Sequence, residues 1–368
     1  MPGTDRFARL AGFMGVVVFL GIQLGGCAAS SLKRLGEPAE IPAEMAQDLA
    51  HFEVKEESAV GSSPSVSASP TPVAAASARV AQPQSQQSQR AEKKQIKNKA
   101  GFAYPNRRPP SEPIYLGERV SYDITYLGMT AGEFSVSVEP FKEINNRKVY
   151  HIKGSAKSSK VFSMFYKLDD TIESFIDYEG IFPHRFQILL DESKQKRNSL
   201  ELFDSEKGRT FFWNRWDHHK RGYTEVKDFF PMQAFSQDSL SSLYFLRTVP
   251  LPTGSVTTFP VISEGKNWEA VVTVVRREEI NTPMGRLKTI VLKPETKYQG
   301  ILKKQGDSFI WLTDDERRFM VRLEAKVKIG SIVAKLKSIE PGIAPQPVKS
   351  ADESLPPTMT KTGAGSQR

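Results

Sequence analysis

Apolar and polar residues alternate with a period of two along most of this chain, and this pattern constrains its fold more than any other feature. The clearest examples are two neighbouring segments whose alternate residues are apolar: Val120, Tyr122, Ile124 and Tyr126, then Phe134, Val136 and Val138. Because successive side chains of a strand point to opposite faces, this pattern predicts strands with one buried face. Residues 127–132 join these strands and include Gly128 and Gly132, which predicts a β-hairpin.

The alternation recurs across residues 113–340, in segments separated by turn-forming Gly, Asn, Asp and Pro: 149–152, 200–203, 271–275, 321–327 and 332–336. Many strands joined by turns favour an antiparallel sheet that curls into a barrel or a sandwich. About 230 residues suffice for one such domain or for two small ones. We therefore predict a mainly β fold, an antiparallel curled sheet or barrel-like domain, flanked by disordered segments.

Residues 238–247 depart from this pattern and predict one short helix. Asp238 is suited to cap its N-terminus, and Leu240 and Tyr244 would then share an apolar face. Pro250 follows and would end the helix. We expect this helix to pack across the sheet or to plug one end of the barrel.

Residues 1–26 have the features of a bacterial lipoprotein signal peptide. Arg6 and Arg9 precede a short apolar run, and Leu24-Gly25-Gly26 leads to Cys27. One alternative is a transmembrane anchor, but the run covers only about 17 residues and a spanning helix needs roughly 20. The other is an ordinary secretory signal beside which the cysteine is incidental.

Cys27 is the only cysteine of the 368 residues, so the chain has no pair for a disulfide bond. The residues before it match the pattern of lipoproteins, whose first mature residue is a cysteine carrying diacylglycerol and an amide-linked chain such as palmitate. We therefore expect a membrane partner, reached through lipidated Cys27. Ala28 and Ala29 follow, and the absence of Asp there resembles lipoproteins sorted to the outer membrane.

Two flanking segments are predicted to be disordered. Residues 27–112 are polar, become rich in Ser, Ala, Pro and Gln, and end in a basic cluster that includes Arg107 and Arg108. As a flexible coil of about 80 residues, this tether would have a root-mean-square reach of about 50 Å. Residues 341–368 are again rich in Pro, Ser, Thr and Gly and are predicted to form a disordered tail.

The net charge of +9 suits anionic lipid or an acidic cell-wall polymer, whereas nucleic acid is not expected outside the cytoplasm. The basic cluster before the domain could also be merely a solvated linker end. The sequence contains no phosphate loop, dinucleotide-binding turn, nucleophile elbow or zinc-ligand spacing. We therefore expect no cofactor, no metal site and no catalytic residue.

Seven residues are candidates for ligand binding. They combine charged groups and aromatic rings that could face a ligand: Arg247, Tyr244, Asp238, Trp311, Asp314, Phe162 and Phe165. Each also has a structural interpretation. Arg247 could form an ion pair with a strand carboxylate that holds the helix to the sheet, and Asp314 could lie in a polar turn. The two phenylalanines could belong to the core, although residues 161–166 are the better candidate for exposed aromatic side chains.

Four stretches of residues 113–339 resemble the DUF3108 family of uncharacterised bacterial envelope domains. They are Gly117–Asp123 with Ala131-Gly132, Gln237–Ser241 with Tyr244 and Arg247, the turn Glu279–Gly285, and Ile310–Asp315 with Arg317-Arg318. The resemblance implies a secreted β-rich domain and carries no catalytic residue.

Together these features favour a non-enzymatic lipoprotein of the outer membrane type whose β-rich domain holds a lipid or another envelope component. One alternative is a structural or interaction protein that reaches a partner or the cell wall. A second alternative is an envelope hydrolase that uses Asp314 or Asp315 as acid or base.

Overall fold

The computed structural model describes residues 40–57, 102–298, 301–303, 307–327 and 330–344. The predicted signal peptide, Cys27 and most of the predicted tether and tail lie outside these residues. The strands are β1 (Lys55–Glu56), β2 (Leu116–Tyr126), β3 (Met129–Ile144), β4 (Arg147–Ser158), β5 (Asp169–Asp177), β6 (Pro183–Glu192), β7 (Gln195–Asp204), β8 (Arg209–His218), β9 (Gly222–Pro231), β10 (Val256–Ser263), β11 (Lys266–Thr282), β12 (Gly285–Tyr298), β13 (Ile301–Lys303), β14 (Ser308–Thr313), β15 (Met320–Lys326) and β16 (Ser331–Ile343). The helical elements are η3 (Ala43–Met45), α2 (Ala46–Leu49), η4 (Ala50–Phe52), α3 (Lys160–Ser163) and α4 (Ser239–Thr248).

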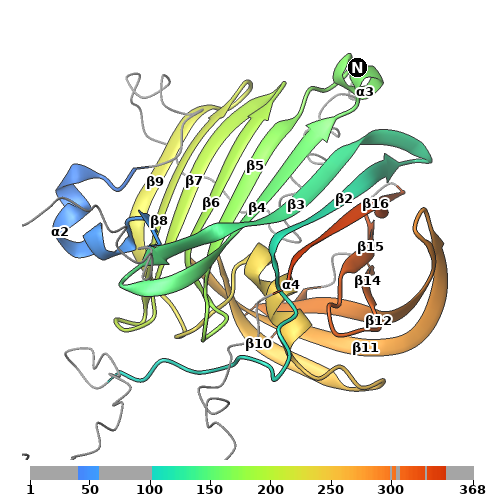
Figure 1. Ribbon diagram of the computed structural model, residues 1–368. Coiled ribbons are helices and arrows are strands. Elements are labelled where there is room, and N and C mark those ends of the chain that lie inside the picture. The colour runs from blue at the N-terminus through green and yellow to red at the C-terminus, as the bar shows by residue number, and fades with distance from the viewer. Residues whose placement is uncertain (1–39, 58–101, 299–300, 304–306, 328–329, 345–368) are drawn as a thin grey trace, which may run out of the picture.

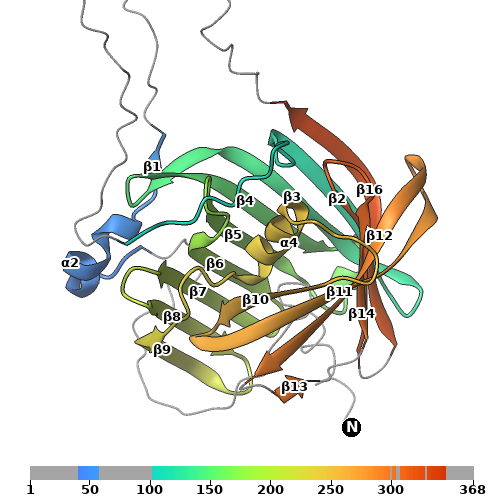
Figure 2. The same ribbon diagram turned by 90° about the horizontal axis from the view of Figure 1, so that it is seen from below.

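All the strands belong to one 16-stranded sheet with the order β10-β11-β12-β14-β15-β16-β2-β3-β4-β5-β6-β7-β8-β9, and β1 and β13 pair at the side of β3 and β12. Neighbours in this order are antiparallel and mostly consecutive in the chain, as short turns require. The sheet curls around α4 (Figures 1 and 2). The predicted antiparallel curled sheet with one packed helix is confirmed.

The first predicted hairpin is formed by β2 and β3. Val120 pairs with Val136, and Tyr122 pairs with Phe134. The connection is shorter than predicted, because only two residues separate the strands. Leu127 and Gly128 both have positive φ values, 50° and 80°, as a two-residue hairpin turn that matches the strand twist requires.

The concave face of the sheet forms the main core. The alternating apolar residues of β2, β3, β5 and β6 lie in it together with the apolar side of α4. Asp238 caps α4, because its side chain accepts hydrogen bonds from the backbone N–H groups of Leu240 and Ser241. The predicted helix and its N-cap are therefore confirmed, and the helix packs inside the curl.

The two ends of the strand order, β9 and β10, do not pair with each other, so the barrel has a seam. Side chains bridge it. The carboxylate of Glu201 on β7 accepts hydrogen bonds from the backbone N–H groups of Glu264 and Gly265, at 3.2 and 3.0 Å, in the β10–β11 turn. Arg197 pairs with Glu264 at 2.7 Å. The side chains of β7 thus hold the far edge of the sheet in place.

Residues 40–57, called the N-terminal strap from here on, correct the prediction of one disordered tether over residues 27–112. The strap contributes η3, α2, η4 and β1, and β1 pairs with β3. Leu49 and Phe52 are 0% and 2% exposed in a second apolar cluster on the convex face of the sheet. The physical reason is burial of these side chains against β4, β7 and β8, which offsets the loss of chain entropy.

Residues 102–112 also lie against the domain, so the predicted tether is wrong for them as well. Arg108 donates hydrogen bonds to the hydroxyl group of Tyr150 at 3.2 Å and to the backbone carbonyl of Tyr178 at 2.9 Å, and it pairs with Glu112. Arg108 is therefore not part of a solvated linker end. At the other end of the domain, β16 continues to Ile343, three residues into the predicted tail.

Candidate functional site

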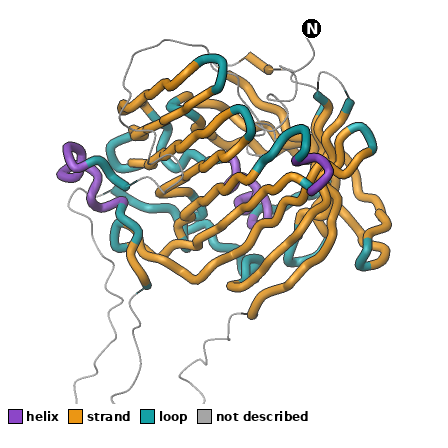
Figure 3. Tube along the Cα trace, turned by 90° about the horizontal axis from the view of Figure 1, so that it is seen from above, coloured by secondary structure: helices purple, strands orange, loops and turns teal. Residues whose placement is uncertain are grey.

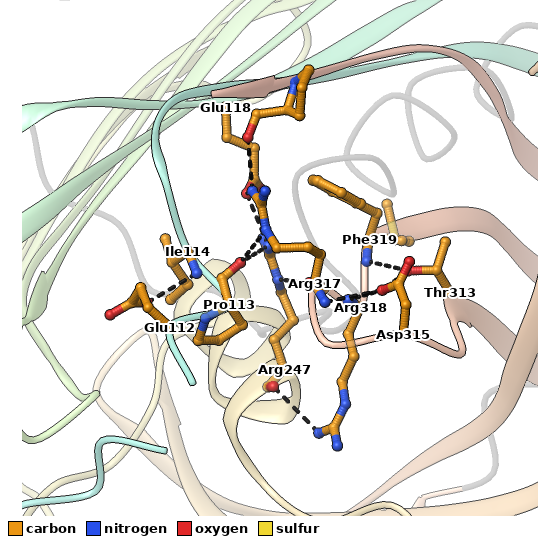
Figure 4. Close-up of polar contacts among 12 residues, drawn as sticks. Glu112, Pro113, Ile114, Glu118, Arg247, Thr313, Asp315, Arg317, Arg318 and Phe319 are labelled. Carbon is orange, nitrogen blue, oxygen red and sulfur yellow. Dashed lines mark hydrogen bonds and ion pairs between the residues drawn. The ribbon is translucent and has the colours of Figure 1, made fainter. Parts of the chain in front are cut away.

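Arg247 lies on α4 with its guanidinium group buried against β2 (Figure 4). It donates two hydrogen bonds to the carboxylate of Glu118, at 2.6 and 2.9 Å, and one to the carbonyl of Pro113 at 2.6 Å. Its Nε atom donates to the carbonyl of Arg317 at 3.0 Å. The structural interpretation of Arg247, an ion pair between the helix and a strand carboxylate, agrees with this geometry.

Arg317 completes the same buried cluster from the β14–β15 turn (Figure 4). It donates to Glu118 at 2.7 Å and to the carbonyl groups of Pro113 and Pro341, at 3.0 and 2.8 Å. One carboxylate thus holds two guanidinium groups, and all their partners belong to the domain itself. The cluster joins β2, α4, the β14–β15 turn and β16, and its contacts hold these four elements together.

Tyr244 and Asp238 lie on the same helix and are 1% exposed. The Tyr244 ring lies 5.0 Å from the Arg247 guanidinium group. Asp238 caps the helix and accepts a hydrogen bond of 2.6 Å from Ser174 on β5. Burial raises the pKa of Asp238 to about 6. Three of the candidate residues thus belong to α4 and its N-cap, where Asp238 and Arg247 bind the two ends of the helix to the sheet.

Trp311 and Asp314 belong to β14 and the turn after it, and make their contacts apart from the candidate residues of α4. Trp311 on β14 is 6% exposed and donates a hydrogen bond of 2.6 Å to Glu278. Asp314 follows the strand in a turn and pairs with Arg277 at 2.9 Å. Its neighbour Asp315 accepts hydrogen bonds from the backbone N–H groups of Arg317 and Arg318. The interpretation of these aspartates as polar turn residues fits their contacts.

Phe165 lies in the loop after α3 and is 79% exposed, at the end of the sheet where β2 meets β3. Four other exposed apolar side chains share this end, and together the five define the α3 surface: Leu127, Met129, Val161, Met164 and Phe165. The loop lies against the hairpin, because Ser159 donates from its backbone to the carbonyl of Ala131 at 2.9 Å. Five of the eleven large exposed apolar side chains of the described residues gather here, which indicates a binding surface rather than scattered exposure.

The loop that carries Phe165 is held in one position by its other residues. The side chain of Ser159 caps α3 by accepting from the backbone N–H group of Phe162, which is half-buried. Tyr166 is 2% exposed and its hydroxyl group donates to Glu192 at the end of β6. Because Tyr166 and Phe162 face inward, Val161, Met164 and Phe165 are turned to solvent. The structure places Phe165 at the surface, as in the alternative interpretation of this segment, whereas Phe162 is half-buried and contributes to the support of the loop.

Beneath the loop, Asp170 and Glu192 form a buried carboxyl pair, and each is 5% exposed. Burial and the neighbouring Glu192 raise the pKa of Asp170 to about 9. Burial also raises the pKa of Glu192. Since two adjacent buried carboxylates repel each other, the pair retains a proton at neutral pH. Its hydrogen bond from Tyr166 ties this protonated pair to the exposed loop.

Basic side chains surround the α3 surface. Lys157, Lys160 and Lys167 lie on β4, α3 and the following loop, and all three are exposed. Lys157 pairs with Asp169 at 3.5 Å and Lys167 pairs with Asp191 at 3.2 Å. The turns β6–β7 and β8–β9 reach the same end, since backbone hydrogen bonds join Lys167 to Ser193 and Lys194 to His219, and they add exposed Lys220 and Arg221. The α3 surface therefore combines exposed apolar side chains, its apolar tips, with these exposed Lys and Arg side chains, its basic rim.

A second group of polar side chains lies beneath the N-terminal strap. Asp177 is fully buried, and its carboxylate contacts Arg147 and, at 3.0 Å, the imidazole of His184. Hydrogen bonds from these two groups lower the pKa of Asp177 despite its burial. Tyr104 covers the group, with its ring stacked 5.9 Å from that of Phe182. These contacts join residues 102–112 to the strand ends.

Across the described ranges, from residue 40 to residue 344 with their gaps, no group of three or more His, Cys, Asp or Glu residues is arranged to hold a metal ion. Within that same part of the chain, no helix is both long and apolar enough to cross a bilayer.

A family model described as "Protein of unknown function (DUF3108)" matches residues 121–337. This chain belongs to the DUF3108 family. The resemblance seen in the sequence is thus confirmed, and the four stretches that carried it include Glu118, Arg247 and Arg317, which the fold of this chain brings together in one cluster. No curated protein matches the chain.

Solved structures similar to this DUF3108 protein share little sequence with it. A β-barrel-like protein of the domain of unknown function DUF1849 from Brucella abortus has 12% identity and a TM-score of 0.40, covering 62% of this chain and 98% of that one. A candidate lipoprotein from Parabacteroides distasonis has 9% identity and a TM-score of 0.29, covering 65% and 100%. A candidate exported protein with a YmcC-like fold from Bacteroides fragilis has 11% identity and a TM-score of 0.29, covering 62% and 98%.

Sequence reasoning missed the buried carboxyl pair, although a signal for it was present. Phe186, Ile188 and Leu190 alternate on the inner face of β6, and Glu192 is the next residue on that face. A carboxyl group that continues an apolar face must find a partner or retain its proton. The partner, Asp170, lies on the neighbouring strand and could not be assigned without the strand register.

Proposed function

We propose that this DUF3108 protein is a lipid-anchored protein of the bacterial outer membrane type, attached through Cys27, whose domain binds lipid surfaces through the α3 surface without catalysing a reaction. The location is supported by the sequence Leu24-Gly25-Gly26-Cys27 after an apolar run. Lipid binding rests on one observation, the gathering of five exposed apolar side chains at one end of the sheet inside a basic rim.

The chemistry of the α3 surface suits a bilayer with anionic head groups. Met164 and Phe165 project from a supported loop, and their apolar side chains would gain free energy on entering the boundary between head groups and acyl chains. Lys160, Lys220 and Arg221 would then lie at the level of the lipid phosphates, where each contributes about 1 kcal/mol. Both contributions favour the same orientation of the domain.

The contacts of the polar candidates support a function without catalysis. Asp238 and Arg247 are satisfied by partners within the domain, and Asp314 is paired with Arg277. For an envelope hydrolase, the alternative function, at least one such group would have to meet a substrate. Replacing Asp314 by Asn is therefore expected to leave the envelope function of the protein intact.

Vesicle binding tests the proposal. The mature chain with Cys27→Ser, which has no lipid of its own, is mixed with vesicles of phosphatidylethanolamine and phosphatidylglycerol, and the bound fraction is measured by flotation. We expect binding that weakens with salt, and a loss of about tenfold for the double variant Met164→Ser/Phe165→Ser, which removes two apolar tips.

The matched control is Met284→Ser in the β11–β12 turn, which replaces another exposed methionine, 51% exposed, outside the α3 surface. This variant should bind like the parent chain. Equal binding by the double variant and the parent, or no binding by the parent, would exclude the α3 surface as a lipid-binding surface.

A further inference from the structure

We infer that the lipid anchor and the α3 surface lie at opposite ends of the domain, so that the protein presents the α3 surface to a second lipid bilayer rather than to the one that holds its anchor. This inference rests on the proposed function for both the anchor at Cys27 and the lipid affinity of the α3 surface. It adds the identity of the partner, an opposing anionic bilayer, and the orientation in which that partner is met.

The first step is the position of the N-terminal strap. Its backbone is bonded to the β3–β4 turn, because Asn145 donates to the carbonyl of His51 at 2.8 Å. Lys55 and Glu56 pair with β3 at the same end, and Leu49 and Phe52 are buried on the convex face. The strap is thus a fixed part of the domain, and the chain from Cys27 arrives there.

The second step is the distance between the two ends. The strap meets the domain where β4 begins, whereas α3 begins at Lys160, two residues after the end of β4. β4 has 12 residues, so these ends are separated by about 40 Å. In Figure 3, α2 of the strap and α3 lie toward opposite ends of the view, with α4 between them in this projection.

The third step is the length of chain between the anchor and the strap. About 13 residues join Cys27 to Glu40, where a flexible coil of that length has a root-mean-square reach of about 20 Å and a fully extended one about 45 Å. The anchoring bilayer therefore lies close to the strap. To turn the α3 surface toward that bilayer, this short segment would have to extend along the whole domain at a large entropic cost.

The fourth step is the character of the α3 surface. Its apolar tips and its basic rim are both exposed at the end farthest from the strap. The charge complements an anionic bilayer, and Phe165 and Met164 supply the apolar contact. A surface of this kind on the far side of an anchored domain is positioned to meet lipid across the gap between two membranes.

Bridging of two vesicle populations tests this inference. The full-length lipidated protein is reconstituted into light vesicles of phosphatidylcholine, and sucrose-loaded vesicles containing phosphatidylglycerol are added. We expect the light vesicles to sediment with the dense ones, and we expect Met164→Ser/Phe165→Ser to reduce this co-sedimentation about tenfold. Met284→Ser should leave it unchanged.

The decisive variant lengthens the anchor segment. Forty Gly/Ser residues inserted after Ser30 raise the reach of the segment to about 40 Å, so the domain can turn over onto its own bilayer. When the light vesicles also contain phosphatidylglycerol, the inserted chain should bridge less than the parent, because its α3 surface binds the anchoring bilayer. The insertion lies outside the folded strap and changes none of its contacts.

The outcomes separate the two proposals. If the soluble Cys27→Ser chain binds anionic vesicles but the lipidated parent does not bridge, or if the inserted chain bridges as well as the parent, the opposing orientation is wrong and the lipid-binding function stands. If the soluble chain does not bind vesicles, the proposed function itself is wrong. Bridging by the parent that depends on Phe165 and declines with the insertion supports both.

Discussion

Arg247 on α4 and Glu118 on β2, 129 residues apart in the sequence, share two hydrogen bonds of 2.6 and 2.9 Å with both side chains buried. A guanidinium group and a carboxylate in this bidentate arrangement fix both the distance and the rotation of the helix relative to the strand. Arg317 binds the same carboxylate from the opposite part of the chain. The two segments of the meander, β2–β9 and β10–β16, therefore meet at this carboxyl group in addition to the β16–β2 strand pairing.

Replacing Glu118 by Gln is expected to lower the free energy of unfolding by about 3–5 kcal/mol, because the buried guanidinium group of Arg247 and the half-buried one of Arg317 lose their charge partner. Urea denaturation measures this loss. Arg119→Gln, at the exposed neighbouring position, should cost less than about 0.5 kcal/mol. If both variants unfold at the same urea concentration, the cluster does not hold the domain together.

Asp170→Asn is expected to change how stability depends on pH. The pKa of Asp170 is raised to about 9 from an ordinary value of 3.8, so the folded state retains a proton that the unfolded chain releases. The unfolding free energy of the parent therefore falls as the pH rises between these values, by up to about 1 kcal/mol per pH unit. The variant lacks this contribution and should become more stable relative to the parent from pH 6 to pH 8.5, measured by urea denaturation.

Asp169→Asn is the control for this experiment, since Asp169 is the adjacent residue and is more exposed, in an ion pair with Lys157. Its stability relative to the parent should stay nearly constant over the same pH range. A pH-independent difference between Asp170→Asn and the parent would contradict the retained proton.

Leu49→Ala is expected to destabilise the domain by about 2–5 kcal/mol and to expose the strap to protease, because Leu49 is fully buried on the convex face of the sheet. Gln47→Ala changes an exposed residue of the same helix and should have little effect. Limited proteolysis followed by mass spectrometry would locate the first cut. Equal protection of the strap in both variants would show that Leu49 does not hold it.

Phe165→Ser is expected to leave the free energy of unfolding within about 0.5 kcal/mol of the parent, since the ring is 79% exposed. Tyr166→Phe, one residue further on, should lower it by about 1–3 kcal/mol because buried Glu192 loses a hydrogen-bond donor. Thermal and urea denaturation compare the two. Strong destabilisation by Phe165→Ser would mean that Phe165 serves the core.

The sheet could be predicted from the sequence because β-strand burial produces a period of two that is visible locally. The helix at residues 239–248 was predictable because its signals are also local: the N-cap Asp238 and an apolar face at helical spacing. For residues 161–166 the sequence left both a core and an exposed position open, and the structure exposes Phe165 while Phe162 faces inward. Which of two neighbouring phenylalanines turns outward depends on the contacts of the loop.

The strap was missed because it lies within a polar segment and is short. Ile41, Met45, Leu49 and Phe52 recur at helical spacing, but a helix this short is not stable in isolation and acquires its stability from the sheet. The partner of Arg247 could not be predicted from the sequence either, since only the complete strand order brings Glu118 next to it. Long-range contacts of this kind leave no periodic pattern in the sequence.

At the seam between β9 and β10 the curled sheet is closed by side chains and not by a ladder of backbone hydrogen bonds. A barrel closed by a ladder of backbone hydrogen bonds can widen only by breaking that ladder, but here Glu201 and Arg197 span the gap. Burial raises the pKa of Glu201 to about 7. Near neutral pH, protonation therefore changes the charge of the carboxyl group that accepts the hydrogen bond from Gly265. Closure of the curled sheet therefore depends on a few side chains at this seam, and one of them, Glu201, has its pKa within the neutral range.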